Sequence, residues 1–150
     1  MKLAEALTER ADLQRRIEQM KNRLYNNAWV QEGEAPAEAP EALIAELTAL
    51  TAQLEEIITR INLTNAATRD GEETITALLA RRDALTLYTE AMRAFLDRAS
   101  DTPSRAARSE IKILPTVSVA EYRKKVDDLS RDLRVLDTRI QALNWTTELM

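Results

Sequence analysis

The most regular hydrophobic pattern of the chain lies between residues 41 and 63. Apolar side chains recur there at alternating steps of four and three residues, at Leu43, Leu47, Leu50, Leu54, Ile57 and Ile61. This spacing puts all six on one stripe of an α-helix, as in the seam of a coiled coil. Pro40 suits a first helical turn. The pattern therefore predicts a helix over 41–63, and Ile44 and Ile58 add a second, partial stripe.

A second strong pattern fills the C-terminal part of the chain. Ser118 and Glu121 have the spacing of a capping box, which marks a helix start. The apolar spacing then continues to the end, at Tyr122, Val126, Leu129, Leu133, Leu136, Ile140, Leu143 and Thr147. We expect a helix over 118–149.

Two weaker patterns predict helices over 3–24 and 71–99. The first has seam spacing with one polar position, Arg10, whose stem we expect to pack while its head reaches water. The second follows Asp70 and Glu73, which we interpret as an N-cap and its capping-box partner. Together the four segments predict an all-α fold: one domain over 1–150, with four long helices in an elongated antiparallel bundle that has coiled-coil-like seams.

Two irregular segments connect these helices. In the first, Gly33 and Pro36 interrupt the helical pattern, and we expect Trp29 and Val30 to pack back on the bundle. The second, 100–117, is long for a structureless loop. We interpret it as an ordered strap between the third and fourth helices, packed by Ile111, Ile113, Leu114 and Val117.

Composition excludes several classes of function. The chain has 150 residues, no His, no Cys and a formal net charge of −4. Cysteine nucleophiles, disulfides, the usual zinc sites and histidine acid–base chemistry are therefore absent. Residues 36–73 carry two bases against eight acids, which argues against nucleic acid as a partner.

The same composition gives no sign of export or of a membrane span. An acid, Glu5, interrupts the N-terminus at once, and no uncharged run exceeds eight residues. We expect a cytoplasmic protein without a membrane partner. Adjacent acids such as Glu55 and Glu56 point in different directions on a helix, so we expect no metal. We assign no catalytic residue and no cofactor, because nothing places a base beside a nucleophile.

Two polar clusters are candidate ligand sites. Asn62 and Asn65 close one predicted helix, and Asn144 and Trp145 close another. In an up-down bundle these ends meet, where they would hold a small polar ligand, although helix capping explains the same residues. The strap bases Arg105, Arg108 and Lys112 would bind an anion, or pair with Glu32, Glu34 and Glu38 of the first linker.

The helical seams also predict association between copies of the chain. Two stripes on one helix and unbroken seams are more apolar surface than one thin bundle needs. We therefore expect a homo-oligomer, with the candidate contact residues Leu47, Leu54, Ile58, Leu129, Leu133, Leu136 and Ile140.

Several segments, in this order and spacing, resemble a family of small bacterial proteins labelled septicolysin. They are residues 1–7, 30–34, 60–62 with 64–65, 108–112, 126–129 and 144–149. The resemblance runs nearly end to end, with Trp29 and Leu63 as departures. It implies a largely helical, uncharacterised bacterial protein and supplies no catalytic or binding residues. Its label suggests a cytolysin, but no segment here is apolar enough to enter a membrane.

Our leading hypothesis is thus a non-enzymatic, self-associating assembly or interaction module. The alternative is a small-molecule or anion binder that uses the polar clusters. Lysis of membranes is a third and disfavoured hypothesis.

Overall fold

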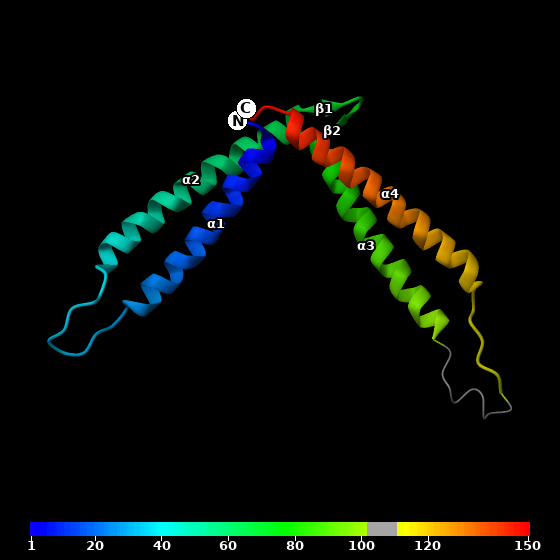
Figure 1. The fold of residues 1–150 in the computed structure, drawn as a ribbon, viewed down its shortest axis with the longest axis horizontal. Coiled ribbons are helices and arrows are strands. Elements are labelled where there is room, and N and C mark those ends of the chain that lie inside the picture. Colours follow the sequence, from blue (N-terminus) through cyan, green and yellow to red (C-terminus); the bar gives the residue numbers. More distant parts are fainter. Residues whose placement is uncertain (102–110) are drawn as a thin grey trace. The chain divides into compact units, whose positions relative to one another are not determined.

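The computed structural model describes residues 1–101 and 111–150 and consists mainly of four long helices (Figure 1). They are α1 (Leu3–Asn26), α2 (Pro40–Ala67), α3 (Ile75–Ser100) and α4 (Val119–Thr146), and two short strands, β1 (Arg69–Asp70) and β2 (Glu73–Thr74), precede α3. Consecutive helices pack as antiparallel pairs, α1 with α2 and α3 with α4. The all-α, four-helix prediction is confirmed.

The described residues form two compact units. Unit 1 contains Met1–Thr74 and Leu143–Met150, and therefore the α1/α2 pair, the hairpin and the last turn of α4. Unit 2 is Ile75–Ala142, which contains the α3/α4 pair.

The core of unit 1 is the seam between α1 and α2. The buried apolar side chains are Leu3, Ala6, Leu13 and Met20 of α1 and Leu43, Leu50, Ile57 and Ile61 of α2. These are seam positions in the predicted pattern, so the interpretation of both segments is confirmed. Arg10 is half-buried, and its Nε is buried without a hydrogen-bond partner in the described structure.

The core of unit 2 is narrower. Its buried apolar side chains are Ile75, Leu78 and Leu96 of α3 and Val126, Leu136 and Ile140 of α4. The Phe95 and Tyr122 rings meet edge to face with centroids 5.9 Å apart, and Arg93 Nη2 donates to Ser130 Oγ at 3.1 Å. The buried apolar side chains, the ring pair and the hydrogen bond from Arg93 to Ser130 hold the two helices together.

The start of the third helix differs from the prediction. Asp70 and Glu73 are not a capping box: they pair with each other in an antiparallel hairpin, and Arg69 pairs with Thr74. Gly71, the first of the two loop residues, has a φ of 67°, whereas Glu72 has no positive φ, which indicates a type II′ turn. Asp-Gly is both a helix-start and a hairpin signal, and the hairpin delays the helix to Ile75.

The end of the fourth helix also differs, because α4 stops at Thr146 instead of continuing to 149. Lys2 and Glu148 form an antiparallel bridge. Leu3 N donates to Thr147 O and Leu149 N donates to Met1 O, both at 2.9 Å. Met1 takes up the Leu149 N–H that a longer helix would use, and the two ends lie side by side (Figure 1).

Neither linker packs as predicted. Trp29 is 84% exposed and Val30 48%, so they do not return to the helices. In the described part of the strap, Ile111 and Leu114 are 79% and 71% exposed. A pair of helices has no third element to cover these side chains. Residues 102–110 of the predicted strap lie outside the described residues.

Candidate interaction surfaces

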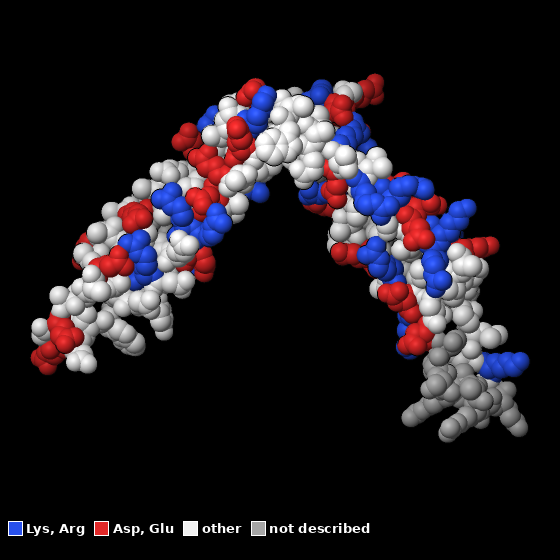
Figure 2. Space-filling model, viewed as in Figure 1, with Lys and Arg blue, Asp and Glu red and all other residues white. Residues whose placement is uncertain are grey.

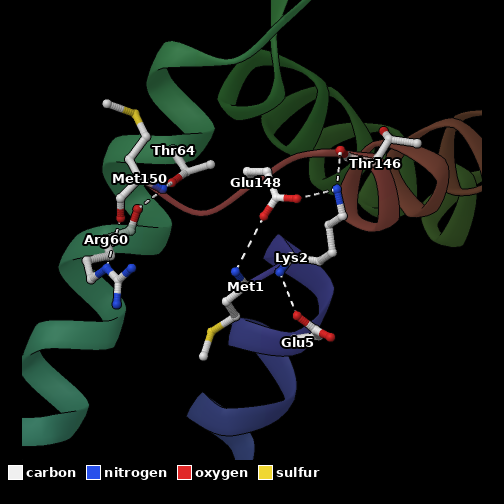
Figure 3. Close-up of polar contacts among 8 residues, drawn as sticks. All are labelled: Met1, Lys2, Glu5, Arg60, Thr64, Thr146, Glu148 and Met150. Carbon is white, nitrogen blue, oxygen red and sulfur yellow. Dashed lines mark hydrogen bonds and ion pairs between the residues drawn. The ribbon is translucent and has the colours of Figure 1, made fainter.

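The paired chain ends form the densest polar cluster of unit 1 (Figure 3). The Lys2 ammonium pairs with Glu148 Oε1 at 2.5 Å and donates to the Thr146 carbonyl at 3.2 Å. The amino group of Met1 lies 3.4 Å from Glu148 Oε2. The Lys2 hydrogen bond, followed by that from the Met1 amino group, lowers the pKa of the Glu148 carboxyl below its ordinary value.

The C-terminal end of the chain is also hydrogen-bonded to α2. Arg60 Nε donates to the Met150 carbonyl at 2.8 Å, and Met150 N donates to Thr64 Oγ1 at 3.0 Å (Figure 3). Thr64 is fully buried, and its hydroxyl donates in turn to the Arg60 carbonyl at 2.8 Å. These polar groups satisfy one another, so the cluster fastens the chain ends and needs no ligand.

Polar contacts also fix the linker between α1 and α2. Asn27 is buried; its amide donates to the Arg23 carbonyl and accepts from Glu38 N, both at 2.9 Å. Arg23 binds the Glu38 carboxylate with two nitrogens and reaches Glu46 at 3.4 Å. The hydrogen bond from Arg23 lowers the pKa of Glu38. Glu38 was predicted to pair with strap bases as one option; its partner in the described structure is Arg23.

The fixed linker presents large exposed side chains. We call residues 28–35 the Trp29 loop. Trp29 is 84% exposed, and the neighbouring Tyr25 side chain is 78% exposed. Gly33, with a φ of 86°, completes a turn in which Glu34 N donates to the Gln31 carbonyl. Acidic side chains gather at this end of unit 1 (Figure 2). The loop therefore combines an exposed aromatic ring with exposed negative charge.

Unit 2 has a groove between its helices. Two neighbouring hollows of about 390 and 210 Å³ share Asp132 and together form what we call the α3/α4 groove. Its lining residues are Arg81, Leu85, Tyr88 and Met92 of α3 and Lys125, Asp128, Leu129, Asp132, Val135, Leu136 and Arg139 of α4. Val135 is 64% and Tyr88 55% exposed. The groove thus has apolar walls and charges of both signs.

A third hollow lies at the open end of the same pair. This end pocket, of about 220 Å³, has the apolar lining residues Phe95, Ala99, Ile113, Leu114 and Pro115. Arg98, Asp101 and Thr116 complete it. Its volume is below the range of about 300–1,000 Å³ that is usual for drug-sized ligands, so it suits a single large side chain better.

The predicted ligand residues are not gathered around any of these hollows. Asn62 and Trp145 are exposed, Asn65 is half-buried and Asn144 is buried. None of the four lines the groove or the end pocket. Lys112 is exposed, whereas Arg105 and Arg108 lie outside the described residues.

The predicted self-association residues divide into two groups. Leu136 and Ile140 are buried within the chain, and the half-buried ones are Leu47, Leu54, Ile58, Leu129 and Leu133. Leu129 and Leu136 line the groove. Sequence reasoning did not name Tyr88, Met92 or Val135 as contact residues. For Tyr88 and Met92 a signal was present, because steps of four and three join 81, 85, 88 and 92.

Within 1–101 and 111–150, no three His, Cys, Asp or Glu side chains come together as they would around a metal ion. Among the helices in these ranges, none combines the length and the apolar character of a membrane span.

Comparison with known proteins shows the family of the chain. No curated protein is significantly similar in sequence. The crystal structure of a functionally unknown conserved protein from Corynebacterium diphtheriae is similar, with a TM-score of 0.92 and 40% identity over 100% of this chain and 99% of that chain. The resemblance to septicolysin-labelled proteins stays a prediction. Residues 10–149 match a family of unknown function (DUF6847), and the chain belongs to that family.

Proposed function

We propose that the protein is a non-enzymatic assembly module in which two copies associate through the α3/α4 groove. The supporting observation is the apolar surface of unit 2. Of the seven large exposed apolar side chains among its described residues, Tyr88 and Val135 line the groove, beside the half-buried Leu85, Met92 and Leu129. Two helices bury only the stripe between them, and a further apolar stripe needs a further layer.

The charges around the groove favour a second copy as that layer. Lys125 and Asp132 stand seven residues apart on α4, about two helical turns, with Leu129 between them. Asp132 makes no ion pair with any described residue, and the Lys125 ammonium lies 4.4 Å from the centroid of the Tyr122 ring. If two α4 helices run antiparallel about an axis between Asp128 and Leu129, each Lys125 comes level with the other copy's Asp132.

The same register brings apolar residues together. It places Val135 of each copy level with Tyr122 of the other, because both pairs of positions are symmetric about the same point. Burial of an exposed Val side chain contributes at most roughly 1.5–3 kcal/mol per copy. The four helices of two units would then share one core, in the manner of a helix laid into a groove.

Val135→Asp tests this proposal. Its side chain is largely exposed, so the substitution spares the core of unit 2. Leu87→Asp is the matched control, because Leu87 is 69% exposed on the same unit but lines neither hollow. Native mass spectrometry and light scattering should give an oligomer for the parent, at most half that mass for Val135→Asp, and the parent mass for Leu87→Asp. A monomeric parent at micromolar concentration would overturn the proposal.

The register has its own test. Lys125→Glu and Asp132→Lys should each weaken association by placing like charges level, and the double variant should restore it. Because the chain has no Cys, Asp128→Cys should give a disulfide-linked dimer on oxidation, whereas Asp127→Cys, on a different side of the helix, should not. Equal cross-linking of both variants contradicts the register but not the association.

Small-molecule binding is a second candidate, supported by one observation. Asn144 is 8% exposed, and no hydrogen bond described for the structure involves its side-chain amide, whose atoms are not fully enclosed. A buried amide favours a partner, which a polar ligand would supply. The adjacent Trp145 is a probe: metabolite fractions should change its fluorescence in a Trp29→Phe variant and raise the melting temperature, and Asn144→Ala should abolish both effects. No change with any fraction contradicts this candidate.

A further inference from the structure

The Trp29 loop carries an unusually exposed aromatic side chain on a well-fixed segment. Trp29 is 84% exposed, yet the loop is anchored by Asn27 and by the Arg23–Glu38 ion pair. A thirteen-residue connection between antiparallel helices is also longer than the usual 2–8 residues. Long, ordered loops with projecting aromatic rings are typical of binding contacts, because a held Trp loses little conformational entropy on docking.

We propose that Trp29 of one copy docks in the end pocket of another copy. This inference rests on the proposed self-association but uses different residues. The end pocket offers about 220 Å³ lined by Phe95, Ile113 and Leu114, which suits one aromatic ring and is small for a free ligand.

Charge favours the same pairing. The Trp29 loop carries Glu32 and Glu34, both exposed, and the described structure assigns neither an ion pair. At the end pocket, Arg98 and Asp101 both line the wall, and Lys112, which is exposed next to Ile113, adds a positive charge beside it. An acidic loop with an exposed Trp therefore meets an apolar pocket that has Arg98 in its wall and Lys112 beside it. Such a contact joins two different surfaces, so it adds copies beyond those paired through the groove.

A fluorescence experiment with three variants, and an association measurement with a fourth, test the contact. The reporter is Trp145→Phe with Leu114→Asp, which keeps Trp29 as its single Trp and has a charged pocket. The titrant is Trp29→Ala with Trp145→Phe, which has no Trp and an intact pocket. Adding titrant should shift the Trp29 emission of the reporter to shorter wavelength. The control titrant also carries Leu114→Asp and should give no shift. Leu114 is 71% exposed, so this change spares the fold.

The fourth variant, Trp29→Ala alone, should weaken association at least roughly 30-fold, as expected for an aromatic hot spot that contributes about 2 kcal/mol. Trp145→Ala, which removes another exposed Trp, should have no such effect. No shift with the intact-pocket titrant overturns the inference. An equal shift with both titrants overturns it as well, because Trp29 would then dock elsewhere. Either failure leaves the groove proposal standing if Val135→Asp still lowers the mass of the assembly.

Discussion

Replacing Asn27 by Ala is expected to destabilise unit 1 by about 2 kcal/mol. The side chain makes two hydrogen bonds of 2.9 Å, one to the Arg23 carbonyl and one from the Glu38 amide, and it is 8% exposed. A typical intramolecular hydrogen bond contributes about 1 kcal/mol net, and a buried group left without a partner costs at least as much. Asn27 caps α1 and does not lie inside it, so Ala gains no helix propensity.

Thermal and urea unfolding measure this change. A loss of 2 kcal/mol lowers the melting temperature by about 4–8 °C in a chain of this size. Asn22→Ala is the matched control, since Asn22 is exposed inside the same helix and Ala there should leave stability equal or slightly raised.

Hydrogen exchange gives a second, local measurement. The Glu38 amide donates to Asn27 Oδ1, so its protection should fall in Asn27→Ala and persist in Asn22→Ala. If Asn27→Ala stays within about 0.5 kcal/mol of the control and the Glu38 amide remains protected, the side chain does not hold the linker and our reasoning about this loop is wrong.

Three further results are expected. The lowered pKa of Glu148 means that its pairing with Lys2 stabilises the protein at neutral pH and is lost as the pH falls below about 4, so Glu148→Gln should flatten the acid part of the melting-temperature profile. Gly71→Ala should cost about 1–2 kcal/mol in urea unfolding because of the positive φ, although no atom lies within 4 Å of the added Cβ. Ile61→Ala should lower the free energy of unfolding by about 2–5 kcal/mol, because Ile61 is 1% exposed, whereas Leu63→Ala should change it by at most about 0.5 kcal/mol, because Leu63 is 56% exposed. Equal effects of the two substitutions would contradict the assignment of Ile61 to the buried seam.

The helices and their seams could be predicted because the information is local. Leu43, Leu50, Ile57 and Ile61 belong to the predicted series of three- and four-residue steps and are buried positions of α2, and only nearby residues are needed to see the pattern. The hairpin at Gly71 was missed because Asp-Gly suits both a helix start and a turn, and two-residue strands leave no alternation to decide between them.

The candidate surfaces were harder to predict because they depend on distant partners. Arg23 and Glu38 lie fifteen residues apart across a linker, so no helical spacing joins them. Val135 lies next to a seam position and differs from Leu136 only in which side of α4 it occupies, yet one is 64% and the other 7% exposed. A repeat of three and four residues marks a stripe, but the width of that stripe is decided by how many helices cover it.

The pairing of the two chain ends has a consequence for folding kinetics. Each antiparallel helical pair joins neighbouring segments, whereas the contact between Met1 and Glu148 closes a separation of 147 residues. Such distant contacts are slow to form, because the chain loses conformational entropy before it gains the contact. We expect both helical pairs to form first and the ends to join last. Amide protons of Leu3 and Leu149 would then exchange through opening of the ends while the seams stay closed, so the rate of this last step is measurable in the native protein.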